Sequence, residues 1–267
     1  MTYVDIPLAR LALVLGFIVL AVVLSRRSRL GLDRDLVWGA LRGAAQLIAI
    51  GYLLLLLFNN ERPGWVLFVL TVMLIVAAAT SSRRVEHGPG WRVLFPRALI
   101  AIGAGAAVTL VPVFAFVVPP HPWYEARYLV PIGGMMLSNA MNVVAQVFER
   151  IFASANSEAD QIEALLALGA TPRQALHRQV RATLRAALIP TINGLLTVGL
   201  VSLPGMMTGQ IVSGTSPEQA VRYQIVIMYQ LVGVAAVAGL LAVAFARRLL
   251  FTRRAQLVLP ARAPTRA

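Results

Sequence analysis

The chain has 267 residues, of which 58% are hydrophobic and 13% charged, and its formal net charge is +13. Soluble proteins average roughly 45–50% apolar and about 25% charged residues, so this composition indicates a membrane protein. The absence of cysteine excludes disulfide frameworks, thiolate metal sites and cysteine nucleophiles. Every basic residue is arginine, and the arginines lie between apolar runs. That placement is typical of membrane orientation and does not predict a nucleic-acid partner.

Seven apolar segments approach the length of about 20 residues that a helix needs to cross the hydrocarbon core of a bilayer. They are residues 8–24, 36–58, 65–80, 98–118, 129–152, 189–212 and 223–246. We therefore predict an all-α, polytopic membrane protein of about seven transmembrane helices, with lipid as its solvent. The third segment is short and the sixth contains Pro204 and Gly205, so either could be a broken or re-entrant element.

The arginines are distributed unequally across successive loops. Nineteen fall on one side of the predicted spans, whereas Arg10, Arg62, Arg127 and Arg222 fall on the other and Arg42 lies within a span. Because arginine is enriched in cytoplasmic loops, the N-terminus is predicted outside and the C-terminus in the cytoplasm. Residues 1–246 are interpreted as a single transmembrane domain, and residues 247–267 as a basic, disordered cytoplasmic tail.

The longest cytoplasmic loop is predicted to form a helical hairpin over about residues 157–187. Ser157 is a suitable N-cap, Gly169 a suitable C-terminal stop, and Thr171 followed by Pro172 a restart. The apolar contacts of the first helix are expected from Ile162, Leu165, Leu166 and Leu168. The second helix is amphipathic, with Leu176, Val180, Thr183, Leu184 and Ala187 opposite Arg178, Arg181 and Arg185. An amphipathic hairpin of this kind needs a surface to pack against.

Several kinds of catalysis are not indicated by the sequence. The phosphate-binding motif G-x-x-x-x-G-K-[ST] requires a lysine, and the chain has none, so no ATP hydrolysis is expected here. His87, His121 and His177 are isolated in predicted loops without a neighbouring carboxylate pair. No G-x-S-x-G motif is present, and no aspartate lies inside a predicted span. We predict no catalytic residue and no cofactor bound by this chain.

Polar residues inside predicted spans indicate functional or structural contacts. Arg42 and Gln46 share one face of the second span. Arg42 either extends toward cytoplasmic headgroups, lines an inner vestibule or forms a structural bridge. Asn139, Asn142 and Gln146 form a single helical stripe on the fifth span. This stripe either lines a transport path or forms interhelical hydrogen bonds.

The sixth span places Met206, Met207 and Gln210 directly after Pro204 and Gly205. A broken helix would free backbone carbonyls to coordinate a substrate, whereas a simple kink would only bend the span. The methionines are either soft metal ligands or apolar filler, so the identity of any metal ligands is unknown. We predict Met206, Met207 and Gln210 as path residues beside Asn139, Asn142, Gln146, Arg42 and Gln46.

Two levels of resemblance to known proteins are carried by these motifs. Residues 163–169, E-A-L-L-A-L-G, resemble the E-A-A-x-x-x-G loop of bacterial ABC permeases. Four longer stretches are similar to the FetB family of iron-export permeases, relatives of the aluminium-tolerance permeases of plants. They are LRGAAQLIAIGYLLLLLF (41–58), GGMMLSNAMN (133–142), EALLALGATPRQA (163–175) and VGLVSLPGMMTGQIVSG with SPEQAVRYQIVIMY (198–229).

The resemblance implies the permease subunit of an ATP-driven exporter in the bacterial inner membrane. It implies a separate cytosolic ATPase that carries ATP and magnesium, a permease homodimer, and export of iron that lowers oxidative stress. The residues that would couple to the ATPase are Glu163, Ala164, Gly169, Ala170 and Thr171. A lipid or an organic solute is the alternative substrate. A nucleotide-independent channel or membrane scaffold is the alternative class, and an intramembrane enzyme is a third.

Overall fold

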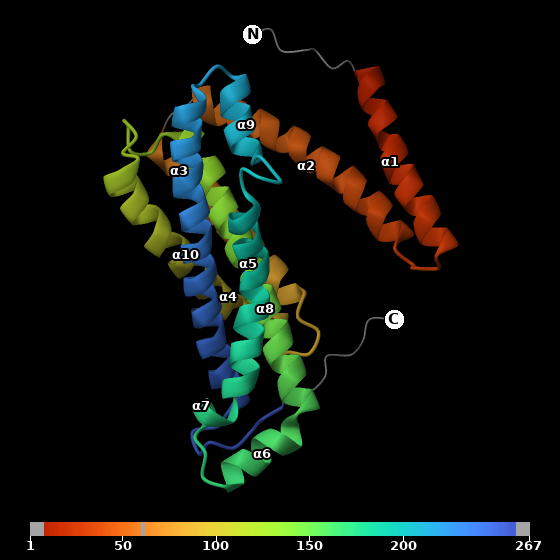
Figure 1. The fold of residues 1–267 in the computed structure, drawn as a ribbon, viewed down its shortest axis with the longest axis vertical. Coiled ribbons are helices and arrows are strands. Elements are labelled where there is room, and N and C mark those ends of the chain that lie inside the picture. Colours follow the sequence, from red (N-terminus) through yellow and green to blue (C-terminus); the bar gives the residue numbers. More distant parts are fainter. Residues whose placement is uncertain (1–7, 60–61, 260–267) are drawn as a thin grey trace. The chain divides into compact units, whose positions relative to one another are not determined.

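The computed structural model describes residues 8–59 and 62–259 (Figure 1). Within these ranges the regular structure is helical apart from two isolated β-bridges, so the predicted all-α class is confirmed. The chain divides into two compact units, Met1–Glu61 and Arg62–Ala267.

The first unit contains α1 (Leu8–Arg27) and α2 (Asp33–Asn59). The turn between them is held at Ser25, whose hydroxyl donates to Asp33 Oδ1 at 3.3 Å and accepts the backbone N–H of Leu32 at 3.2 Å. Arg26 Nε also donates to Asp33 at 3.3 Å. Most large apolar side chains described on these helices are exposed within the unit, as expected for helices that contact lipid or another protein surface.

The second unit contains the remaining helices. In chain order they are α3 (Pro63–Arg83), α4 (Trp91–Pro112), η1 (Val113–Val117), α5 (Ala126–Ser157), α6 (Ala159–Ala167), α7 (Pro172–Ala175), α8 (His177–Thr197), α9 (Gly205–Val212) and α10 (Pro217–Leu250). At about 1.5 Å per residue, α5 is about 48 Å long and α10 about 51 Å. Both therefore exceed the hydrocarbon core of about 30 Å and extend beyond it.

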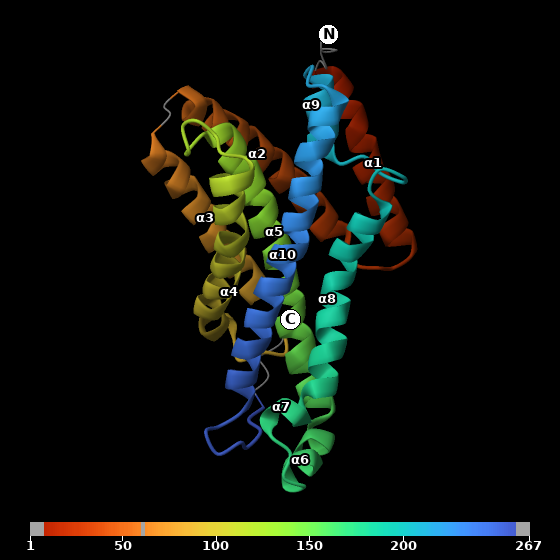
Figure 2. The same cartoon turned by 60° about the vertical axis from the view of Figure 1, so that its left-hand side comes forward.

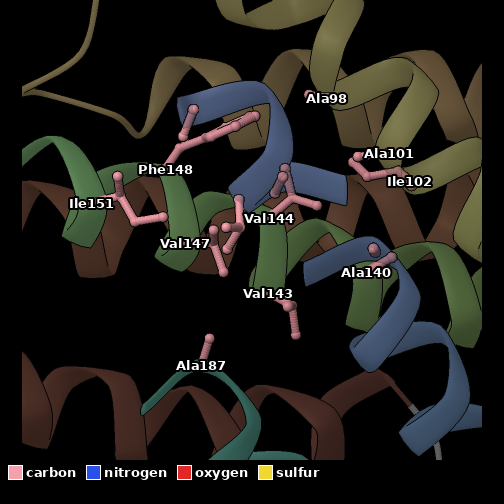
Figure 3. Packing of buried hydrophobic residues seen from close by; sticks show 14 of the residues in the cluster. Ala98, Ala101, Ile102, Ala140, Val143, Val144, Val147, Phe148, Ile151 and Ala187 are labelled. Atoms are coloured by element: carbon pink, nitrogen blue, oxygen red, sulfur yellow. The ribbon is translucent and has the colours of Figure 1, made fainter. Parts of the chain in front are cut away.

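Helices α5 and α10 form the centre of this unit. α5 packs against α3, α4, α8 and α10, and α10 also packs against α4, α8 and α9. The core is rich in small side chains on α4 and α10, whereas α5 contributes larger ones, including fully buried Phe148, Ile151 and Phe152. Figure 3 shows part of this core, with labelled residues of α4, α5 and α8. Small residues allow the close helix packing on which membrane bundles depend.

Helices α4 and α10 approach each other closely at Gly105 of α4. A Cβ atom built there would lie 3.1 Å from the Ala238 Cβ of α10 and 3.3 Å from the Ala238 nitrogen and the Val234 carbonyl oxygen. Two of these three neighbours are backbone atoms, which have little freedom to move aside. Glycine at position 105 is therefore what lets the backbones of α4 and α10 approach each other.

Five helices are long and apolar enough to cross a membrane, judged by length and composition within the described residues. They are Asp33–Leu55, Pro63–Arg83, Trp91–Val117, Ala126–Ser157 and Pro217–Leu250. The third predicted segment, which seemed short in sequence, is a continuous helix of 21 residues. Its length of about 31 Å is sufficient for a full span. The total of seven spans stays a prediction.

The sixth predicted segment is broken, which excludes the simple kink that the sequence left open. α8 ends at Thr197, residues 198–204 form a non-helical turn, and α9 begins at Gly205. The turn contains Gly199 at φ +81° and a hydrogen bond of 3.0 Å from the Gly199 N–H to the Ser202 carbonyl. α8 also differs from the prediction at its other end, because it runs without interruption from His177 through Pro190. The second helix of the hairpin and the start of the sixth segment are one element.

Candidate functional site

The helical hairpin lies at one end of the second unit and consists of α6, α7 and the beginning of α8 (Figure 1, Figure 2). The predicted N-cap Ser157 is wrong, because α5 continues through Ser157 and Glu158 precedes α6. The Ser157 hydroxyl donates to the Ser154 carbonyl of its own helix instead. Continuation of the apolar face of α5 through buried Ala155 outweighs the local capping preference of serine.

The tip of the hairpin has a fixed backbone shape. Gly169 follows α6 at φ +86°, its N–H donates to Leu166 O at 3.0 Å, and the Ala170 N–H donates to Leu165 O at 3.0 Å. These two bonds make a Schellman motif, in which glycine relieves the strain of the left-handed conformation. The predicted stop at Gly169 is confirmed.

The restart after Gly169 is also confirmed. Thr171 and Gln174 form a capping box, in which Gln174 Oε1 accepts the Thr171 N–H at 2.8 Å and Thr171 Oγ1 accepts the Gln174 N–H at 3.4 Å. Pro172 occupies the first turn of α7. The hydrogen bonds that shape residues 169–174 are thus made within the hairpin tip itself.

The residues predicted to couple to an ATPase are accessible at this tip. Glu163, Ala164, Gly169 and Thr171 are exposed, and Ala170 is half-buried. Of the residues expected to supply apolar contacts, Ile162 is fully buried and Leu166 packs against the core. Leu165 and Leu168 have no such contact within the described chain, and their exposed fractions are 42% and 84%. Two exposed leucines beside the predicted coupling residues make this surface suitable for a protein partner.

The base of the hairpin is attached to α5 by a polar cluster. Glu158 Oε2 accepts hydrogen bonds from Arg178 Nη2 at 2.7 Å and from Gln179 Nε2 at 2.8 Å. Hydrogen bonding by Arg178, and then by Gln179, lowers the pKa of the Glu158 carboxyl. The predicted amphipathic face of α8 is confirmed, since Leu176, Thr183 and Ala187 are buried while Arg178, Arg181 and Arg185 are exposed.

Replacing Glu158 with glutamine is expected to loosen α6. A carboxyl whose pKa is lowered on folding stabilises the folded state above its ordinary pKa, and this contribution is lost as pH falls through the lowered value. Hydrogen exchange, corrected for intrinsic rates, should show α6 losing protection in the unmodified chain as pH falls below 4.5, the ordinary pKa of a glutamate carboxyl. Glu158→Gln should exchange a few-fold faster at neutral pH and lack this acid step. Glu163→Gln, on an exposed carboxylate of the same helix, should keep the step, and its loss in both variants would contradict the assignment.

The C-terminal segment, residues 251–259, packs beside the hairpin. Phe251 pairs with Leu257 in a bridge, and the Val258 N–H donates to Leu250 O at 2.8 Å. Its residues Arg254, Ala255, Gln256 and Leu257 face Glu163, Leu166, Ala167 and Ala170 of the hairpin across a shallow cavity. The prediction of a disordered tail from residue 247 is therefore wrong for residues 247–259, because α10 continues to Leu250 and apolar contacts hold the segment that follows. Residues 260–267 lie outside the described residues.

Asn139 connects three helices. Its Nδ2 donates to the Leu231 carbonyl of α10 at 2.8 Å, and its Oδ1 accepts from Thr191 Oγ1 of α8 at 3.1 Å. Both ends of the amide are thus used in interhelical hydrogen bonds, the structural alternative that the sequence left open for this stripe. That Asn139 also lines the transport path stays a prediction.

Asn139→Ala is expected to lower the free energy of unfolding by about 1 kcal/mol, since each interhelical hydrogen bond in a membrane contributes about 0.6 kcal/mol. Thr191→Val removes one of the two bonds and should cost about half as much. Asn193→Ala, an exposed neighbour of Thr191 on α8, is the matched control and should have no effect. Thermal unfolding in detergent measures all three. Unchanged stability in Asn139→Ala with loss of transport would instead assign the side chain to the path.

Asn142 and Gln146 lie together on the second half of α5, toward the hairpin. They line a shallow polar depression of about 230 Å³, defined by Arg84, Asn142, Ala145, Gln146, Glu149 and Arg150. Arg84 Nη1 donates to Asn142 Oδ1 at 3.2 Å and so connects the end of α3 to α5. The structure thus brings two of the predicted path residues to one surface.

Glu149 joins α5 to the loop between α3 and α4. Its Oε2 accepts the backbone N–H groups of Glu86 at 2.8 Å and His87 at 3.4 Å, and its Oε1 contacts His87 Nδ1. Asn156 Nδ2 adds a bond of 3.4 Å to the His87 carbonyl. The sequence predicted an isolated His87, and this prediction is wrong because the side chain contacts Glu149. The partners are more than 60 residues apart in the chain, and no local motif connects them.

The other predicted path residues lie elsewhere. Met206, Met207 and Gln210 are half-buried on α9, which packs against α10 at the end of the unit opposite the hairpin (Figure 1). The Gln210 Oε1 is buried and has no hydrogen-bond partner among residues 8–59 and 62–259. Arg42 and Gln46 are exposed on α2 in the first unit. Within the second unit, the predicted path residues therefore lie in separate places, with Asn142 and Gln146 in the polar depression and Met206, Met207 and Gln210 on α9.

Arginines concentrate at the hairpin end of the second unit. The segments at that end are the end of α3, the start of α4, the end of α5, the hairpin with the first half of α8, and the end of α10 with the residues after it (Figure 2). They carry thirteen described arginines, namely Arg83, Arg84, Arg92, Arg97, Arg150, Arg173, Arg178, Arg181, Arg185, Arg247, Arg248, Arg253 and Arg254. The starts of α3, α5 and α10 lie at the other end and carry three described arginines, namely Arg62, Arg127 and Arg222. Within residues 8–59 and 62–259, no group of three or more histidine, aspartate or glutamate side chains is arranged to hold a metal ion.

Known proteins resemble this chain over most of its length. A relative from Escherichia coli, named "Probable iron export permease protein FetB", is 36% identical over 81% of this chain and 82% of its own. The Arabidopsis thaliana protein ALUMINUM SENSITIVE 3 is 37% identical, over 83% of this chain and 78% of its own. The rice membrane protein STAR2 is 39% identical, over 79% of this chain and 72% of its own.

No solved structure matches the structure of this chain. The family model described as "Uncharacterised protein family (UPF0014)" matches residues 8–251, which include every helix described above. The sequence resemblance to the FetB family and its plant relatives is thereby confirmed. The chain belongs to the UPF0014 family of membrane proteins.

Proposed function

We propose that this chain is the permease subunit of an ATP-driven ABC exporter whose ATPase is a separate polypeptide. The observation that carries the proposal is the helical hairpin, which presents Glu163, Ala164 and Gly169 together with exposed Leu165 and Leu168. Its tip is shaped by its own Schellman motif and capping box, while its base is attached to α5 through Glu158. A tip of fixed shape on an anchored base suits the transmission of movement from a partner to the bundle.

The charge distribution supports a cytoplasmic position for the hairpin. Arginines are enriched in cytoplasmic loops, and the described arginines of the second unit gather at the hairpin end. In this orientation the chain lies in the inner membrane with seven crossings, its N-terminus outside and its C-terminus in the cytoplasm. The ATPase then reaches the hairpin from the cytosol and carries ATP and magnesium itself. Two permease copies pair with two ATPases.

Iron is the proposed substrate. Its support is the similarity to the relative named as a probable iron export permease. In the proposed mechanism, closure of the ATPase dimer moves the hairpin, and through Glu158 and the continuous helix α8 it moves α5 and the broken segment at residues 198–204. Asn142 and Gln146 on the inner side and Met206, Met207 and Gln210 on the outer side then line successive parts of the path.

Transport by inverted membrane vesicles tests this proposal. Vesicles containing the chain and its partner ATPase should accumulate iron when ATP is supplied, and vesicles with a hydrolysis-deficient ATPase should not. If ATP is hydrolysed without iron accumulation, iron is the wrong substrate, and lipids or organic solutes should be tested in the same vesicles. If iron crosses equally with the inactive ATPase, the chain is a nucleotide-independent channel.

A further inference from the structure

The polar depression on the second half of α5 is lined by two arginines and by one carboxylate that already has hydrogen-bond partners. Its charged lining residues are Arg84, Arg150 and Glu149. Both carboxylate oxygens of Glu149 are already engaged, since Oε2 accepts the backbone N–H groups of Glu86 and His87 and Oε1 contacts His87 Nδ1. Glu149 therefore has little remaining capacity to bind a ligand within the depression.

The other polar groups of the depression mainly offer hydrogen-bond donors. Arg84 uses Nη1 to bond Asn142 Oδ1, which occupies the acceptor of that amide and leaves its Nδ2 group without a bond in the described part of the chain. Arg150 is exposed, and among the described residues neither its guanidinium nor the Gln146 amide has a side-chain hydrogen bond. Two guanidinium groups beside two amides favour an anionic oxygen ligand, because the planar guanidinium binds carboxylate and phosphate groups bidentately.

We propose that the polar depression binds a solute through a carboxylate or phosphate group. This inference rests on the proposed export function. The exported substrate enters on the hairpin side as an anion, such as a metal bound in a polycarboxylate chelate. Asn142 and Gln146 belong to both the depression and the polar stripe of α5, so a ligand bound here lies at one end of that stripe. Arg84 and Arg150 would bind the oxyanion, and Asn142 and Gln146 would orient it.

Equilibrium binding to the complex of full-length chain and ATPase in nanodiscs, without nucleotide, tests this site. The probes are citrate, ferric citrate and inorganic phosphate. Arg150→Gln removes a guanidinium without a described partner, so its fold should be unaffected, and binding should weaken about tenfold. Arg84→Gln should weaken binding at least as much. Arg181→Gln, an exposed arginine on α8 outside the depression, should bind like the unmodified chain.

The probes separate the two sources of the oxyanion. Citrate binding that phosphate does not displace supports a carboxylate ligand, and the reverse supports a phosphate ligand. The proposal is overturned if none of the probes binds, or if the Arg84 and Arg150 variants bind them as tightly as the unmodified chain does. It is also overturned if ferrous ion alone binds and Glu149→Gln abolishes that binding. The binding experiment contains no nucleotide, so absence of binding would not contradict ATP-driven export. Conversely, absence of iron transport in a chain that still binds the probes would contradict the export function and not the binding site.

Discussion

Gly169→Val is expected to uncouple ATP hydrolysis from transport while leaving membrane insertion intact. Gly169 has φ +86°, and nothing lies within 4 Å of a Cβ atom built there. A valine therefore fits sterically, but it strains the left-handed backbone by about 1–2 kcal/mol. Relief of this strain reshapes the tip that is proposed to contact the ATPase. A loss of about 1.4 kcal/mol in the free energy of docking corresponds to a tenfold weaker equilibrium constant. Transport per ATP hydrolysed should therefore fall by about tenfold.

Gly214→Val is the matched control for this experiment. Gly214 has φ +101° and equally open surroundings, but it follows α9 at the end of the unit opposite the hairpin. The two variants therefore carry similar backbone strain in different places. Iron transport and ATP hydrolysis should be measured on the same vesicles. Normal coupling in Gly169→Val, or equal uncoupling in Gly214→Val, would count against a specific role of the hairpin tip.

Gly105→Val is expected to have the largest effect on stability. Even a methyl group at position 105 would press on the Ala238 nitrogen and the Val234 carbonyl oxygen, each 3.3 Å away. Because backbone atoms cannot rotate aside, α4 and α10 must separate, and overpacking of this kind costs about 1–3 kcal/mol. The midpoint of thermal unfolding in detergent should fall, and the yield of monodisperse protein should fall with it.

The control for Gly105 is Gly194→Val on α8. A Cβ atom at position 194 would meet only the terminal methyl carbon of Met228, at 4.0 Å. Both substitutions place valine inside a helix, so their effects on helix propensity are similar. An equal loss of stability in the two variants would show that the close approach of α4 to α10 is not what Gly105 provides.

Elements with strong local signals were well predicted from the sequence. Apolar runs located α3, α5 and α10, and the stop at Gly169 and the restart at Thr171 appear where glycine and capping preferences placed them. Prediction from local sequence preferences was correct at Gly169 and Thr171 because their hydrogen bonds are formed with neighbours in the chain. It failed at Ser157, where packing of α5 determines the end of the helix.

Features that depend on distant parts of the chain were missed. Residues 251–259 resemble a basic tail in sequence, but their position depends on the end of α10 and on the hairpin. Likewise, Glu149 and His87 meet only because α5 packs beside the loop after α3. The stripe on α5 was predicted as one feature, yet Asn139 bonds to α8 and α10 while Asn142 bonds to Arg84. Helical periodicity places residues on a face but does not identify their partners.

Site-specific photo-crosslinking to the ATPase is the most direct test of the proposed docking at the hairpin. A photoreactive residue at Leu168, which is 84% exposed beside Gly169, should crosslink to the ATPase in native membranes. The same residue at Trp123, 61% exposed in the loop before α5 at the opposite end, should not. A crosslink at Leu168 alone is the predicted result. No crosslink at Leu168, or equal crosslinking at Trp123, would contradict the assignment of the hairpin as the ATPase-binding element.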